Sequence, residues 1–235
     1  MGVKVKFEKR FIGIPGVTQG GYVAGVLAGL IDGAAVVNLR RPPPLERELE
    51  MVKQQDGAVE LRDKGHIVAD GGPTSLNLKI PEPVTVHEAR MASQDYPYLK
   101  SHPAPNCFVC GTNRADGDGL RIFPGPIAKR DFFAACWIPD ASVANSVGHV
   151  RAEIVWAALD CPSYFAFLPT GKLDSFLVRM RADLPAPISV NREHVVMAWP
   201  ISEDGRKRLA GVAIYDIESK LCAIGETLWV IQNGI

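Results

Sequence analysis

Apolar and polar residues alternate at the start of the chain, and the spacing then changes to three and four. Residues 3–11 alternate Val and Phe with Lys and Glu, which predicts a β-strand. From Thr18 apolar residues recur on one face, which predicts a helix that ends at Asp32 and Gly33. Most other positions in this helix are Gly or Ala, and an interior Gly costs about 1 kcal/mol relative to Ala. We therefore expect burial on nearly all sides, with neighbours close to the helix backbone.

The rest of the first half alternates as strands do, until prolines interrupt the pattern. Asp63, Lys64 and Gly65 predict a hairpin turn. Strands are predicted at residues 34–39, 45–55, 57–61, 65–71 and 74–78. Five prolines then fall within residues 80–106, which we interpret as an extended linker or crossing segment.

A similar order of elements follows the linker. A loop is predicted at residues 139–148 and a helix at residues 149–167. Strands are predicted at residues 119–123, 131–138, 175–181, 188–200, 206–216 and 220–231. Each half is thus one helix with antiparallel strands, an α+β pattern rather than alternating βαβ units. The predicted halves are residues 1–80 and 106–235, joined by a linker at residues 81–105.

The composition restricts the class of protein. The chain has 235 residues, and its 26 Lys and Arg balance 26 Asp and Glu, so no positive field attracts nucleic acid or anionic lipid. No segment approaches the uninterrupted apolar length of a membrane span, and residues 1–10 lack the apolar core of a signal peptide. Five cysteines, an odd number, favour the reducing cytoplasm. We expect a cytoplasmic protein that binds neither nucleic acid nor membranes.

The spacing of the cysteines along the sequence does not predict a metal site or a redox pair. Cys107 and Cys110 form a Cys-x-x-Cys pair, and His102 precedes them, which leaves too few ligands for zinc. Loop-like sequence follows the pair, rather than the helix start that a redox pair needs. The other cysteines lie in apolar runs typical of a core: Cys136, Cys161 and Cys222. We therefore predict no metal and no cofactor.

Three local motifs stand out along the chain. Residues 16–25, Gly-Val-Thr-Gln-Gly-Gly-Tyr-Val-Ala-Gly, resemble the Gly-Gly loop that opens the hotdog helix. Residues 106–111, Asn-Cys-Phe-Val-Cys-Gly, with Gly-Leu at 119–120, resemble a Cys-x-x-Cys-Gly…Gly-Leu motif of single-hotdog thioesterases. Ala-Ala-Leu-Asp at residues 157–160 is similar to the helix position of the catalytic Asp in acyl-CoA thioesterase II. Together they resemble the double hotdog acyl-CoA thioesterases of the thioesterase II and PaaI-like types, which implies two tandem hotdog units, each an antiparallel sheet around one long helix.

The resemblance implies that the two halves contribute different groups to one site. Gly20 and Gly21, with the side chain of Gln19, would donate hydrogen bonds to the thioester oxyanion at a helix N-terminus. Asp160 would activate water or attack the carbonyl. The residues implied to bind substrate are Tyr22, Trp156, Ser163 and Tyr164. Because the site of a hotdog dimer lies between its subunits, two fused halves can build one site.

Structural roles compete with these assignments. The glycines also suit a tight turn or a close helix–sheet contact, and Asp160 also suits a helix end, because Pro162 disfavours helical geometry in the residue before it. The thioesterase II type further uses a Gln and a Thr or Ser from strands of the second half. This chain has Glu226 and Thr227 near its last strand and no Gln at the matching place.

The function implied is hydrolysis of an acyl-CoA, or another acyl thioester, to the free acid and thiol, in a protein that forms homo-oligomers. A hotdog protein that binds acyl groups or CoA without hydrolysis is the alternative from another class. A hotdog hydratase or dehydratase would pair an Asp with a His, and the nearest His, His149, is at an unsuitable spacing from Asp160.

Overall fold

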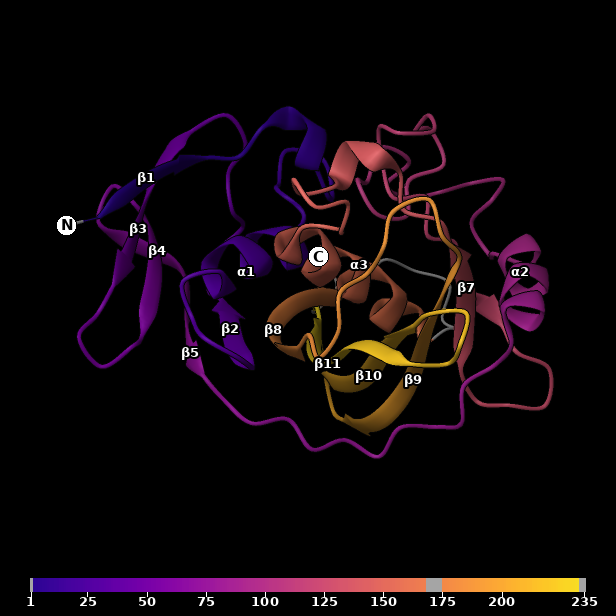
Figure 1. Ribbon diagram of the computed structural model, residues 1–235. Coiled ribbons are helices and arrows are strands. Elements are labelled where there is room, and N and C mark those ends of the chain that lie inside the picture. The colour runs from indigo at the N-terminus through magenta and orange to yellow at the C-terminus, as the bar shows by residue number, and fades with distance from the viewer. Residues whose placement is uncertain (1, 168–174, 233–235) are drawn as a thin grey trace.

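A single antiparallel sheet curves around two helices in the computed structural model, which describes residues 2–167 and 175–232 (Figure 1). Its eleven strands lie in the order β1-β3-β4-β5-β2-β8-β11-β10-β9-β7-β6. The strands of the first half are β1 (Val3–Lys6), β2 (Ala35–Leu39), β3 (Glu48–Lys53), β4 (Val59–Asp63) and β5 (His66–Pro73). Those of the second are β6 (Gly125–Pro126), β7 (Phe133–Trp137), β8 (Ser175–Asp183), β9 (His194–Asp204), β10 (Lys207–Tyr215) and β11 (Leu221–Ile231).

The order of strands repeats between the halves and confirms the predicted α+β repeat. In each half the strand after the central helix, β2 or β8, lies at the middle of the sheet. These two strands pair antiparallel, with Val37 opposite Met180. The two halves are therefore continuous through backbone hydrogen bonds, and one apolar core fills the space between sheet and helices.

The central helices are α1 (Gly20–Ala28) and α3 (Ala152–Phe165), and they cross at unusually short range. A Cβ placed on Gly25 would lie 2.6 Å from the Cα of Glu153 and 2.7 Å from the Cβ of Trp156. The predicted burial of α1 with close neighbours is thus confirmed, and the neighbour is the other helix. Helix α3 continues through Pro162, so Asp160 lies inside the helix rather than at a break.

Three predictions about the chain between these elements are wrong. The predicted extended linker contains a helix, α2 (Val86–Gln94), because Thr85 and Glu88 form a capping box on a stretch without proline. Residues 74–78 and 119–123 are not strands. The second segment bonds locally instead, with the N–H of Leu120 donating to the carbonyl of Phe108 at 2.8 Å, and Arg121 has a φ of 51° that extended strands do not allow.

Helix α2 lies on the outer side of the second half, opposite α3 (Figure 1). Ala89 and Ala92 pack there in a second, smaller apolar cluster with Phe132, Met197 and Trp199. Two short 3-10 turns, η1 (Lys9–Phe11) and η2 (Ala141–Val143), complete the elements, and the first of them ends the predicted opening strand early. Within residues 2–167 and 175–232, no helix has the length and hydropathy needed to cross a membrane.

Candidate functional site

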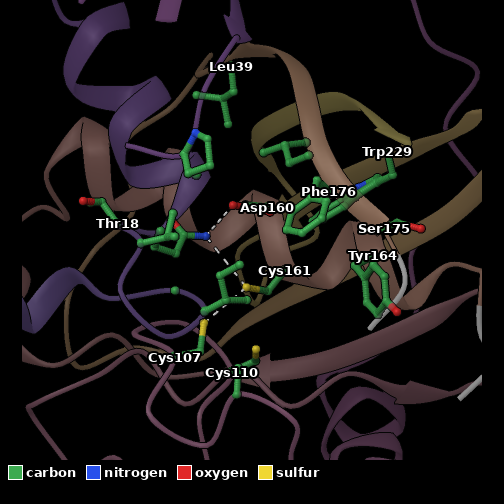
Figure 2. Close-up of a pocket in the computed structure, with 18 of the residues that line it drawn as sticks. Thr18, Leu39, Cys107, Cys110, Asp160, Cys161, Tyr164, Ser175, Phe176 and Trp229 are labelled. Atoms are coloured by element: carbon green, nitrogen blue, oxygen red, sulfur yellow. Dashed lines mark hydrogen bonds between the residues drawn. The ribbon is translucent and has the colours of Figure 1, made fainter. Parts of the chain in front are cut away.

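A cavity of about 360 Å³ opens beside the N-terminus of α1. Such a volume is typical of small-molecule sites. Its walls come from both halves: the turn before α1, the end of β2, helix α3, strand β8 and a segment of residues 98–110 (Figure 2). The lining is mostly apolar, and the side chains that form its apolar wall include Ile14, Val17, Leu39, Phe176, Leu177 and Trp229.

Asp160 is the carboxylate that the described residues contribute to this wall, and only 3% of its surface is exposed. Its Oδ2 accepts a hydrogen bond from the backbone N–H of Gly21 at 2.6 Å. It accepts another from Nε2 of Gln19 at 2.5 Å, which a dashed line marks in Figure 2. Its Oδ1 is also buried and has no hydrogen-bond partner among the described residues. One oxygen is therefore fixed by α1, while the other can accept a proton from a ligand or water.

The sequence at the start of α1 explains why these groups meet. Gln19 is the N-cap residue, and its Oε1 accepts from the N–H of Tyr22 at 2.6 Å, which directs Nε2 toward Asp160. A Cβ on Gly21 would lie 2.6 Å from the Cβ of Asp160 and 2.7 Å from the carbonyl oxygen of Trp156. Glycine is thus required at residue 21 for α3 to bring its carboxylate within reach of the backbone N–H.

Burial dominates the electrostatics of the site. Desolvation raises the pKa of Asp160 to about 7, the hydrogen bond from Gly21 opposes this rise, and nearby Cys107 adds to it. A group with such a pKa at a cavity wall is typical of functional sites. The N–H of Gly20, at the first position of α1, has no hydrogen-bond partner among the described residues, and this residue lines the cavity.

The structure divides the residues implied to bind substrate into two groups. Tyr164 lines the cavity, where its ring meets that of Trp229 edge to face at 5.2 Å. Tyr22 stacks on Phe11 with ring centroids 3.9 Å apart, and Trp156 is buried at the helix crossing; neither is on the cavity wall formed by the described residues.

Ser163 lies behind the wall and supports it. Its Oγ donates to the backbone carbonyl of Asp160 at 2.6 Å and accepts from Nε1 of Trp229 at 3.0 Å. The same indole N–H is 3.1 Å from Oγ1 of Thr227. Glu226 points elsewhere, since it pairs with Arg181 at 3.1 Å. The amide beside the carboxylate is therefore that of Gln19, from the first half of the chain.

Sequence reasoning missed several groups on the cavity wall. Cys161, expected in the core, lies on the wall next to Asp160, together with Cys107 and Cys110. Phe176 and Trp229 also lie there. No signal in the sequence separates Cys161 from a core cysteine, because it lies in an apolar run and only the fold places it beside Cys107.

Comparisons with protein-family models and with curated protein sequences gave no match. Solved structures with the same fold were found at low sequence identity. A hotdog-fold protein of Alicyclobacillus acidocaldarius is 11% identical, covers 99% of this chain and 93% of its own, and has a TM-score of 0.64. An acyl-CoA thioesterase II, TesB2, of Mycobacterium marinum is 11% identical, covers 98% and 93%, and has a TM-score of 0.61.

A third similar structure is a tesB protein of Mycobacterium avium subspecies paratuberculosis, which is 12% identical, covers 98% and 92%, and has a TM-score of 0.62. These matches extend over both halves of the chain. They show that its fold is the double hotdog, as the sequence motifs imply.

Proposed function

We propose that this double hotdog protein hydrolyses acyl thioesters, with acyl-CoA as the substrate class, in the cavity around Asp160. The observation that carries the proposal is the unequal environment of the two carboxylate oxygens. Asp160 lines the cavity; its Oδ2 is held by Gly21 and Gln19, whereas its Oδ1 is buried without a partner among the described residues. A general base needs one oxygen that is held in position and one that is free to take a proton.

In the proposed reaction, Oδ1 of Asp160 takes a proton from a water molecule as its oxygen attacks the thioester carbonyl carbon. The tetrahedral intermediate then loses the sulfur when the C–S bond breaks. The departing thiolate takes the proton from Asp160, which leaves a carboxylic acid and a thiol and restores the carboxylate. The thiolate is a good leaving group, so one carboxyl group suffices as both base and acid.

The charge that develops on the carbonyl oxygen requires a donor, and Gly20 is the best placed. Its N–H is one of the first of α1, where helix N–H groups have no intrahelical partner and the helix dipole favours negative charge. The N–H of Gly21 already donates to Asp160, so we assign it to positioning the carboxylate rather than to the oxyanion. This changes the role that the sequence motif implies for Gly21.

The wall of the cavity supports an acyl-CoA substrate. The apolar residues Leu39, Phe176 and Leu177 suit an acyl chain. Arg41 lies exposed at the edge of the same cavity, where its guanidinium can meet the phosphates of CoA. Its neighbour Arg40 is already paired with Asp70.

The test is hydrolysis of acyl-CoAs of different chain lengths by the purified protein and by Asp160→Asn. We expect turnover on at least one chain length and a loss of about 10²–10⁴-fold in kcat for the variant. Asp131→Asn is the matched control, because Asp131 is exposed and is not among the described residues that line the cavity. Absence of turnover on every acyl-CoA, or full activity of Asp160→Asn, would contradict the proposal.

Binding without hydrolysis is the second candidate, and one contact favours it. Because Gly21 donates to Asp160, one of the two helix N–H groups is unavailable to a carbonyl oxygen. Calorimetry with acyl-CoA that shows binding, with no free thiol produced, would support this candidate. His149, the histidine that a hydratase would pair with the carboxylate, is not among the described residues that line the cavity, and its backbone forms an isolated β-bridge with Ser189.

A further inference from the structure

Three cysteines from two distant parts of the chain converge on one side of the cavity. Cys107 and Cys110 come from a turn in the segment before β6, and Cys161 comes from α3 (Figure 2). Their Sγ atoms all lie within 4.8 Å of one another, and those of Cys107 and Cys161 are 3.6 Å apart. None of the three is in a disulfide bond.

These separations match the edges of a tetrahedral zinc site. A Zn–S bond of about 2.3 Å places two thiolate ligands about 3.8 Å apart in a tetrahedron. The distance of 3.6 Å between Cys107 and Cys161 is close to this value, and the limit of 4.8 Å leaves about 1 Å for side-chain adjustment at the third sulfur.

The turn that carries two of the cysteines is closely packed against its own backbone. The N–H of Gly111 donates to the carbonyl of Cys107 at 3.0 Å, and a Cβ on Gly111 would lie 2.5 Å from that oxygen and from the carbonyl oxygen of Pro105. Only glycine fits there, so the backbone fixes the spacing of Cys107 and Cys110 before any metal binds. This preorganisation is what a metal site requires of its ligands.

We propose that Cys107, Cys110 and Cys161 bind one Zn²⁺ ion, with the fourth coordination position facing the cavity. Three thiolates in a tetrahedral arrangement select zinc among the common divalent metals. Along the sequence, the nearby candidate ligands are Cys107, Cys110 and His102. In the folded chain the third ligand beside the two cysteines is Cys161 rather than His102. His102 is engaged elsewhere, since its Nδ1 accepts from the N–H of Ala104 at 2.9 Å and its Nε2 is 2.8 Å from the hydroxyl of Tyr96.

A second contact supports thiolate character at the site. Nε2 of Gln19 lies 3.7 Å from Sγ of Cys161 and donates toward it (Figure 2). Hydrogen-bond donors of this kind, one shell beyond the metal, orient the ligands of metal sites and stabilise their charge. The other two cysteines provide the contrast: Cys136 and Cys222 lie singly, apart from this cluster. The proposal does not depend on the proposed hydrolysis.

The zinc ion would connect the segment before β6 to α3 at the residue next to Asp160. Binding a metal only in the folded state stabilises that state by mass action. We therefore expect the thermal midpoint of unfolding to rise when zinc is added to the metal-free protein and to fall again with a chelator.

The test is to purify the reduced protein without a metal-affinity column and to measure its metal content by elemental mass spectrometry. We expect about one zinc per chain, released when a mercurial reagent modifies the thiols. Cobalt added to the metal-free protein should give the charge-transfer and ligand-field bands of tetrahedral thiolate coordination. Cys161→Ser should lose most of the zinc, whereas the matched control Cys136→Ser should keep it.

Titration of metal-free wild type with cobalt needs no substitution, so it tests the proposal even if a variant fails to fold. Absence of zinc together with absence of the cobalt bands would overturn the proposal. So would retention of zinc by folded Cys161→Ser, or a disulfide between two of the three cysteines in protein kept under reducing conditions.

Discussion

Replacing Gly25 by Ala tests how closely the two central helices must approach. The added Cβ would lie 2.6 Å from the Cα of Glu153, 2.7 Å from the Cβ of Trp156 and 3.0 Å from the carbonyl oxygen of Glu153. Carbon atoms reach their optimal contact at about 3.5–4.0 Å, so α1 and α3 must separate by about 1 Å. The nearest atom belongs to the backbone of α3, and it cannot turn away as the end of a side chain can.

The free energy of unfolding of Gly25→Ala should therefore fall by about 2 kcal/mol. Overpacking of a core costs about 1–3 kcal/mol, and the backbone clash places this site near the upper end. The gain in helix propensity from Gly to Ala offsets about 1 kcal/mol of that cost. Urea unfolding followed by tryptophan fluorescence measures the difference, with Trp156 as a probe at the crossing itself.

Gly29→Ala is the matched control, because it makes the same change at the end of the same helix. There the nearest atom to an added Cβ is the carbonyl oxygen of Val26, at 3.3 Å, and φ is −60°. We expect this variant to be as stable as the wild type or slightly more stable. If Gly25→Ala unfolds at the same urea concentration as Gly29→Ala, α1 and α3 do not lie as close together at Gly25 as these distances indicate.

Two further predictions concern the cavity and its surroundings. Gly20→Ala should keep the fold but lower kcat, because the new Cβ lies 3.3 Å from Oδ2 of Asp160, beside the proposed oxyanion donor. The control is Gly72→Ala, which has no atom within 4 Å of its added Cβ and should change neither the fold nor kcat. Burial acts to raise the pKa of Asp70, but the hydrogen bonds from Arg40 and Asn38, together with the charge of Arg40, outweigh burial and lower that pKa. Its stabilising effect is present above the unfolded pKa of about 3.9 and disappears as pH falls through the lower folded pKa. The difference in unfolding free energy between wild type and Asp70→Asn should thus be larger at pH 7 than at pH 3, and an equal difference at both would contradict the ion pair.

The elements with a clear period were predictable from the sequence, and their partners were not. The small residues of α1 show that something approaches closely, since a helix so rich in glycine needs burial. Local sequence does not reveal that the partner is α3, more than a hundred residues later in the chain. Residues 119–123 have apolar residues in a strand-like order, but they bond to the neighbouring turn at Phe108 and Val109 rather than to the sheet.

The candidate site was predictable only in part for the same reason. Resemblance to known motifs singled out Gln19 and Asp160, which lie 141 residues apart and are joined by one hydrogen bond. It did not indicate that Gly21 holds the carboxylate, because that depends on the crossing of two helices. Cys161 lies in an apolar run and was indistinguishable from a core cysteine until the fold placed it beside Cys107.

The two halves of the sheet are related by an approximate repeat, but their helix starts have diverged. Where α1 begins with Gln19 and Gly21, α3 begins with Arg151 and Glu153, whose side chains form an ion pair at 2.8 Å. In a dimer of identical subunits, the same helix sequence must supply the N–H donors in one copy and the carboxylate in the other. Every substitution in that helix therefore alters both copies. In this chain each helix can change without the other. Selection can therefore adjust the carboxylate in α3 while the glycines of α1 stay as they are, and the proposed reaction has one site per chain.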